Sequence, residues 1–86
     1  MRRFDLPVQN GTRKSFYGKA KVIEHDNGDI SLISYSTLVC RIHNGKFEKL
    51  CDGYSATTMR HVNSFLLFYN LPGGGKSWWD KLEVAA

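Results

Sequence analysis

The sequence has no long apolar run and few prolines and glycines, and each absence excludes a class of protein. The longest unbroken apolar stretch runs from Phe65 to Tyr69, far short of the roughly 20 residues that cross a membrane. No apolar stretch follows Met1-Arg2-Arg3, so we expect no secretory signal. Two prolines and eight glycines among 86 residues are too few for a disordered or collagen-like chain.

Cysteine is also scarce. Cys40 and Cys51 are the two present, and the sequence contains no Cys-x-x-Cys pair. Two thiols without an expected leader favour a reducing compartment, so we predict a cytoplasmic protein. A hairpin closed at Asn44-Gly45 would place the two thiols diagonally on one sheet face, farther apart than a disulfide spans. We therefore predict free thiols, no metal site and no cofactor.

The length and the 42% of apolar residues fit a single small domain over residues 1–86. Phe4, Leu6 and Val8 alternate near the N-terminus, and Pro7 would confine such a strand to a sheet edge. The three predicted parts are a basic N-terminal segment with this possible edge strand, a sheet with its helix, and a glycine-rich hinge with a tryptophan-containing tail. They cover residues 1–17, 18–71 and 72–86.

Turn signals divide the middle of the chain into strands. The β-rich stretches are residues 18–25, 29–43 and 46–51. They are separated by Asp26-Asn27-Gly28 and Asn44-Gly45, both typical of tight hairpin turns. Residues 29–43 are interpreted as one long strand bent near Ser34-Tyr35-Ser36, and two strands broken at that point are the alternative.

If both Asn-Gly corners close two-residue turns, the apolar side chains of these strands share one face. The predicted core face carries Ile23, Ile30, Leu32, Leu38, Cys40, Ile42, Phe47 and Cys51, with Lys49 as a misfit. The opposite face carries Val22, Ile33, Tyr35, Thr37, Val39, Arg41, His43 and Leu50. That second face is too apolar to be fully exposed to solvent, so we expect that either the chain's own ends or a partner cover it.

A helix follows the sheet. Its apolar residues recur at helical spacing, as Met59, Val62, Phe65, Leu66 and Tyr69. Ser55 or Thr57 would cap its start, Asn70 would end it, and Ser77 would cap a last helical turn. The predicted fold class is α+β, an antiparallel three- to four-stranded meander with one main helix packed on one face and a short C-terminal helical turn.

No pattern predicts a catalytic site. Gly74-Gly75-Lys76-Ser77 lacks the earlier glycine of a phosphate-binding loop and follows a helix rather than a strand. Thr57 and Thr58 fit a helix start better than they fit nucleophiles. A small enzyme that uses His61 with one of these threonines is the third-ranked alternative. We predict no enzymatic activity and no catalytic residues.

The net charge of +4 is concentrated at one end. Residues 1–21 carry six basic side chains and one acidic, whereas residues 22–86 carry six basic and seven acidic. Clustered cations can neutralise phosphates, and tyrosines can stack on bases; a merely solvated N-terminus is the alternative. The predicted nucleic-acid-binding residues are Arg2, Arg3, Arg13, Lys14, Lys19, Lys21, Arg41, Lys46 and Arg60.

Two motifs resemble a group of small, mostly uncharacterised domains from bacteria, their phages and mobile elements. Residues 33–39 contain Ser-Tyr-x-Thr-x-Val, and residues 54–61 read Tyr-Ser-x-Thr-Thr-x-x-His, followed by Phe65-Leu66. The resemblance covers roughly residues 30–69 and brings no established activity. It implies a phage or mobile-element protein and, by analogy of size and provenance, a small inhibitor of host defence of the anti-CRISPR kind.

The leading prediction is a non-enzymatic protein of the host cytoplasm that binds nucleic acid or a nucleoprotein complex through its basic surface. The alternative is an inhibitor that binds a host defence protein through an apolar and aromatic face. The residues predicted for that face are Tyr35, Val39, His43, Trp78 and Trp79.

Overall fold

A computed structural model describes residues 1–7, 18–52 and 56–85 of the chain. The elements in chain order are β1 (Arg2–Asp5), β2 (Ala20–Glu24), β3 (Ile30–Ser34), β4 (Thr37–His43), β5 (Lys46–Lys49), α1 (Ala56–Phe68) and α2 (Lys76–Lys81). The α+β prediction is confirmed, with five strands where three to four were expected. No helix of the described residues is long and apolar enough to cross a membrane.

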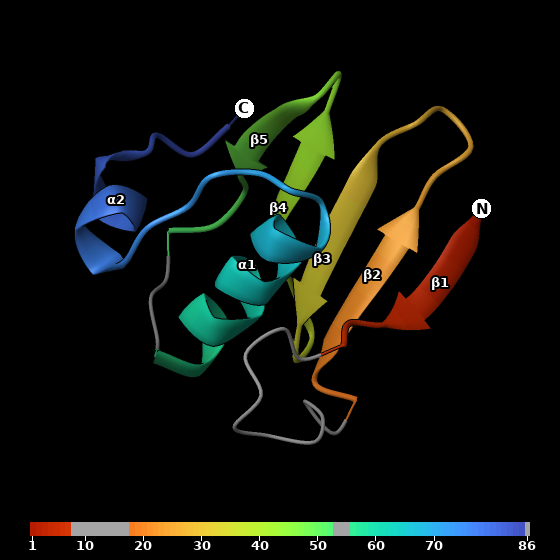
Figure 1. The fold of residues 1–86 in the computed structure, drawn as a ribbon, viewed down its shortest axis with the longest axis horizontal. Coiled ribbons are helices and arrows are strands. Elements are labelled where there is room, and N and C mark those ends of the chain that lie inside the picture. The colour runs from red at the N-terminus through yellow and green to blue at the C-terminus, as the bar shows by residue number, and fades with distance from the viewer. Residues whose placement is uncertain (8–17, 53–55, 86) are drawn as a thin grey trace.

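The strands form one antiparallel sheet in the order β1-β2-β3-β4-β5. Figure 1 shows α1 lying across one face of this sheet and α2 beyond β5. After α2 the chain returns to the sheet edge, where Val84 bridges Lys49 in parallel and the Ala85 amide donates to the Lys49 carbonyl at 2.7 Å. The tail is thus tied to the end of β5 at Lys49.

The hydrophobic core lies between α1, α2 and the covered face of the sheet. Its buried members are Leu6, Ala20, Val22, Leu32, Val39, Cys40, Ile42, Met59, Val62, Phe65, Leu66 and Trp79. The helical stripe predicted over Met59–Tyr69 therefore packs as expected. Cys40 and Cys51 are free thiols, as predicted.

The Asn44-Gly45 corner behaves as the sequence predicts. Both residues have positive φ, 52° and 76°, which is the backbone of the hairpin turn that the Asn-Gly pair favours. The turn sets Ile42 opposite Phe47 and His43 opposite Lys46.

The first corner is wider than predicted. The His25 amide donates to the Asp29 carbonyl at 2.8 Å, so the loop has three residues, and its third, Gly28, takes a φ of 94°. This shifts the register of β2 by one residue and sets Val22, not Ile23, opposite Leu32. A one-residue shift exchanges the two faces of a strand. Val22 is therefore in the core, and the prediction for Ile23 was wrong, although Ile23 is also buried.

Residues 29–43 form two strands, as in the alternative prediction. The chain reverses at Tyr35-Ser36, and Ser34 pairs with Thr37. A β-bulge follows, because Leu32 pairs with Cys40 while Ile33 pairs with Leu38. The extra residue of this bulge is Val39.

Two face predictions fail at this bulge. Val39 is buried at 2% exposure, whereas Leu38, predicted for the core, is 46% exposed. An extra residue in one strand changes which side the following residues face, and no signal in the sequence marks its position.

The helix ends are partly as predicted. Asn70 adopts a φ of 57°, and the Leu71 amide donates to the Leu66 carbonyl at 2.8 Å, which is a Schellman-type end. Ser55 lies outside the described residues. Ser77 does not cap α2, because that helix begins at Lys76 and its N-cap, Gly75, makes no side-chain cap bond.

An edge contact ties the N-terminus to α1. Glu24 accepts a hydrogen bond from the Tyr69 hydroxyl at 2.7 Å and pairs with the Arg2 guanidinium at 2.7 Å. The hydroxyl first, and then Arg2, hold the pKa of Glu24 below its ordinary 4.5. A lowered carboxyl pKa adds stability above the unfolded pKa, and that stability disappears as pH falls through the folded pKa.

We expect Glu24→Gln to reduce the loss of stability between pH 6 and pH 3, because the variant has no carboxylate to protonate at this contact. Urea unfolding at the two pH values measures the difference. Glu83→Gln, at an exposed position of the tail, is the matched control. An acid-induced loss in Glu24→Gln equal to that of the parent protein contradicts the assignment.

Candidate nucleic-acid interface

The sheet face opposite α1, here called the outer face, holds four of the nine predicted nucleic-acid-binding residues and His43 of the predicted protein-binding residues. Strand register places on it Arg3, Asp5, Lys21, Ile23, Ser31, Ile33, Leu38, Arg41, His43, Lys46 and Glu48. No helix of the described residues packs on this face (Figure 1). The exposed side chains on it are Arg3, Asp5, Lys21, Leu38 and Lys46, whereas Ile23 and Ser31 are buried.

Five of the nine predicted cations lie on or beside the outer face. Arg3, Lys21, Arg41 and Lys46 come from four different strands of it. Lys19 precedes β2, and its ammonium lies 5.8 Å from the centroid of the Tyr35 ring. The fold thus gathers cations that are up to 43 residues apart in the sequence.

The other four predicted cations are elsewhere. Arg2 lies on the helix side of β1 with Glu24, and Arg60 is exposed on α1. Arg13 and Lys14 lie outside the described residues. The predicted basic arm is therefore not one surface within the part of the chain that the structure describes.

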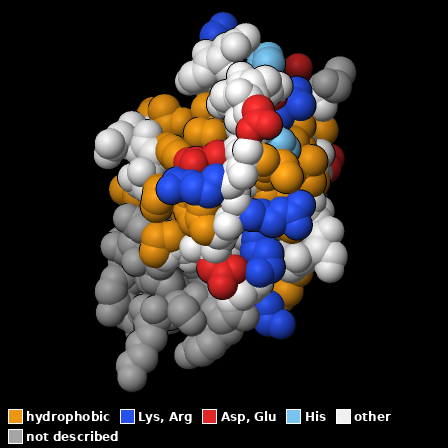
Figure 2. Space-filling model, turned by 90° about the vertical axis from the view of Figure 1, so that its right-hand side faces the viewer, with side chains coloured by type: hydrophobic (Ala, Val, Ile, Leu, Met, Phe, Trp, Pro, Cys, Tyr) orange, Lys and Arg blue, Asp and Glu red, His pale blue; other side chains and the backbone are white. Residues whose placement is uncertain are grey.

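Acidic side chains partly neutralise the outer face. Lys21 pairs with Asp5 at 2.9 Å, and Arg41 pairs with Glu48. Arg3 and Lys46 make no ion pair among the described residues. Figure 2, which looks onto the β1 side of the molecule, shows basic side chains interspersed with acidic and apolar ones rather than a continuous basic patch.

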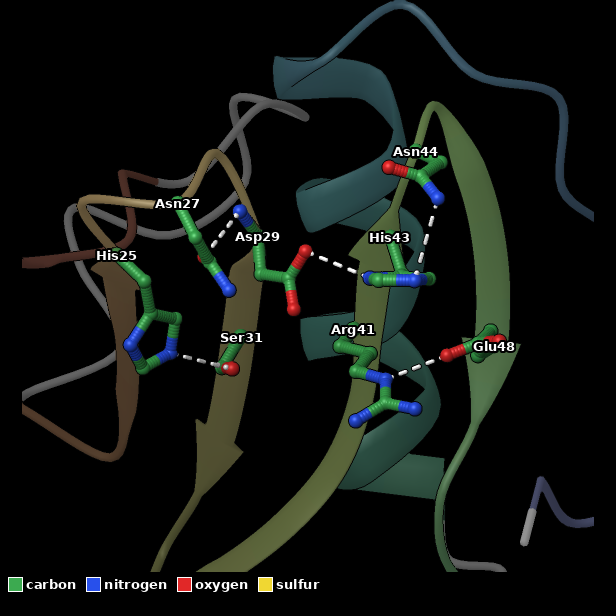
Figure 3. A network of polar contacts seen from close by, with 8 residues as sticks. All are labelled: His25, Asn27, Asp29, Ser31, Arg41, His43, Asn44 and Glu48. Atoms are coloured by element: carbon green, nitrogen blue, oxygen red, sulfur yellow. Dashed lines mark hydrogen bonds and ion pairs between the residues drawn. The ribbon is translucent and has the colours of Figure 1, made fainter.

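Two histidines on or beside the outer face make hydrogen bonds to neighbouring side chains (Figure 3). His43 Nδ1 lies 2.7 Å from Asp29 Oδ1, and its Nε2 lies 3.3 Å from Asn44 Nδ2. Because a carboxylate can only accept, His43 Nδ1 donates this hydrogen bond to Asp29. The His43 hydrogen bond is the main cause that lowers the pKa of Asp29. His25 Nε2 similarly lies 2.9 Å from Ser31 Oγ.

The two sequence motifs meet in space at the β3–β4 turn. Ser34 Oγ lies 2.7 Å from His61 Nδ1 and 3.4 Å from Thr58 Oγ1. The Tyr35 ring lies 5.9 Å from the His61 ring. Ser34, Tyr35, Thr58 and His61 are called the turn cluster below. Sequence reasoning missed Ser34 as a candidate, because its link to His61 depends on where β3 ends.

Two side chains of the turn cluster, Ser34 and His61, are inaccessible to a substrate. Ser34 is 2% exposed and His61 is 1% exposed, so a substrate would have to displace the packing above them. Burial also raises the pKa of the Cys40 thiol, which keeps it protonated and unreactive. Within the described residues, no three His, Cys, Asp or Glu side chains could hold a metal ion together.

The residues predicted for a protein-binding face are divided by the fold. Tyr35 is 54% exposed at the β3–β4 turn, and His43 is accessible on the outer face. Val39 and Trp79 are buried in the core, so neither is available to a partner. Trp78 is half-buried, with its ring 5.4 Å from that of Phe47. The tail tryptophans thus fix α2 rather than form a surface.

A comparison with protein families gives one match. A family of unknown function, DUF8033, matches residues 4–81, which is nearly the whole chain. No curated protein and no solved structure matches it.

Proposed function

The chain belongs to this family of unknown function, and we propose that it is a non-enzymatic protein that binds single-stranded nucleic acid through the outer face. The observation that carries the proposal is the gathering of Arg3, Lys21, Arg41 and Lys46 on one sheet face, with Lys19 beside an exposed tyrosine ring. Cations that follow the backbone, together with aromatic rings that stack on bases, are the usual means of binding single strands.

The ion pairs of the outer face are compatible with this role. The side chains of Lys21 and Asp5 are 51% and 64% exposed, and exposed pairs of this kind contribute about 0–1 kcal/mol. A phosphate can therefore replace the carboxylate at small cost. Arg3 and Lys46 make no ion pair among the described residues, so a phosphate can contact them without replacing a carboxylate.

The proposal predicts salt-dependent binding. The association constant for a fluorescein-labelled, twelve-nucleotide oligothymidylate should fall steeply between about 50 and 200 mM salt, because bound phosphates release counterions. Replacing Arg3 and Lys46 together with alanine should weaken binding and reduce the slope of log K against log salt by about 1.4, since each contact to a single strand contributes about 0.7. Fluorescence anisotropy measures both quantities.

The double variant Arg60→Ala/Lys81→Ala is the matched control, because it removes the same two positive charges from exposed positions on α1 and α2. It should leave the salt slope unchanged. An equal reduction in this control would show that net charge alone matters, and the outer face would not be the site.

A protein partner is the second candidate. Tyr35 and Leu38 are exposed apolar side chains close to the same turn, and Ile33 pairs with Leu38 on the next strand. Tyrosine and aliphatic groups of this kind are common at protein interfaces. A more specific form of this candidate is an inhibitor of host defence encoded by a phage or mobile element. It rests on the resemblance of the two sequence motifs to small domains from bacteria, phages and mobile elements. Absence of oligonucleotide binding at low salt would favour this candidate.

A further inference from the structure

Tyr35 has an unusual backbone for an aromatic residue. It is the first residue of the two-residue β3–β4 turn and adopts a φ of 57°. The left-handed region is unfavourable for side chains other than glycine, asparagine and aspartate, and bulky residues found there often serve a function. The ring gains little burial in return, because Tyr35 is 54% exposed.

The surroundings of Tyr35 hold it in this conformation. Its amide donates to the Lys19 carbonyl at 2.7 Å, which ties the turn to the start of β2. Its ring lies against the His61 ring, and His61 is in turn held by Ser34 at 2.7 Å. Both of these supporting side chains are buried. The exposed Tyr35 ring therefore packs against two buried side chains, Ser34 and His61, that hydrogen-bond to each other.

We propose that Tyr35 is the stacking platform for an unpaired base, and that Ser34, Thr58 and His61 are positioning residues that fix its ring. The inference rests on the proposed function and adds the ligand group that Tyr35 contacts. Every base has a π-face, so a single fixed tyrosine favours single strands without reading their sequence. The exposed Lys19 ammonium lies over the Tyr35 ring, 5.8 Å from its centroid. A stacking base would displace this ammonium, which would then meet the adjacent phosphate.

The test compares two probes that carry the same phosphates. One is the twelve-nucleotide oligothymidylate, and the other is an abasic strand of equal length. The parent protein should bind the first roughly tenfold more tightly, since stacking on one aromatic ring gives about that difference. Tyr35→Asn should bind both probes equally, at the affinity of the abasic strand. Asparagine tolerates positive φ, so the melting temperature of this variant should be unchanged or higher.

Two further variants keep the backbone strain and change only the side chain. Tyr35→Phe should keep the preference for bases, and Tyr35→Leu should lose it. Ser34→Ala tests the positioning role: it should reduce the ratio of the two affinities while the abasic affinity stays the same, whereas simple unfolding would weaken both. Leu38→Asn, which removes another exposed apolar side chain near this turn, is the control and should keep the preference.

The outcomes separate the two proposals. If the parent protein binds neither probe at low salt, the proposed function fails. If it binds both and Tyr35→Asn or Tyr35→Leu keeps the preference for bases, the role of Tyr35 is overturned while nucleic-acid binding stands. A parent protein that binds the two probes equally overturns the stacking role in the same way.

Discussion

Replacing Trp79 with alanine is expected to remove a large part of the protein's stability at 25 °C. Trp79 is fully buried, and it joins α2 to β5 through Phe47, whose ring centroid is 6.5 Å away. Truncating a buried tryptophan costs about 3–5 kcal/mol. A domain of 86 residues has roughly 4–13 kcal/mol of stability in total. Urea unfolding followed by far-UV circular dichroism gives the loss without depending on tryptophan fluorescence.

Trp78→Ala is the comparison, because Trp78 is the neighbouring residue and is only half-buried. Its loss of stability should be clearly smaller. If the two variants had the same urea midpoint, the docking of α2 by Trp79 would not be a main source of stability.

A buried lysine explains why the tail docks where it does. The Lys49 ammonium donates to the carbonyl oxygens of Trp79 and Leu82 at 3.1 and 3.3 Å and lies 4.9 Å from the Trp79 ring. Backbone carbonyls at a helix end need a donor when they are buried. Lys49, the misfit of the predicted core face, supplies a donor to the Leu82 carbonyl and a second one to the Trp79 carbonyl, which also accepts from the Leu82 amide at 3.1 Å. The stem of Lys49 packs in the core.

Local turn chemistry determined how much of the fold could be predicted. Asn44-Gly45 specifies its own backbone, so the register of β4 and β5 follows from the sequence. Asp26-Asn27-Gly28 allows both a two- and a three-residue loop. The two-residue loop that we assumed placed Ile23 on the core face, whereas the three-residue loop of the structure places Val22 there. Tyr35-Ser36 contains none of the usual turn residues, so the reversal there was visible only as an alternative.

The candidate site was harder to predict, because it depends on contacts between distant residues. The register of the strands determines which cations form ion pairs. Lys21, for example, pairs with Asp5, which is 16 residues away in the sequence. Ser34 meets His61 across 27 residues. The sequence identified Tyr35 as a candidate surface residue, but its φ and its support appear only once the turn is built. Composition predicts the existence of a basic surface, whereas topology decides which cations share it.

The Ser34–His61 contact is expected to be the second large contribution to stability. His61→Ala should cost about 2–4 kcal/mol, because it opens a cavity and leaves the Ser34 hydroxyl without its imidazole partner in a buried place. Ser34→Ala should cost less, about 1–2 kcal/mol, since a smaller group is removed. The double variant should be less destabilised than the sum of the two, with a coupling energy of about 1 kcal/mol.

Chemical unfolding of the four proteins measures this coupling. His43→Ala is the matched control, since His43 also bonds a side chain through Nδ1, at 2.7 Å from Asp29, but is 42% exposed. Exposed contacts of this kind contribute little, so its cost should stay below about 1 kcal/mol. Additive losses in the Ser34 and His61 variants would mean that the two motifs are neighbours without being coupled, and the rigid support for Tyr35 would have to come from the backbone alone.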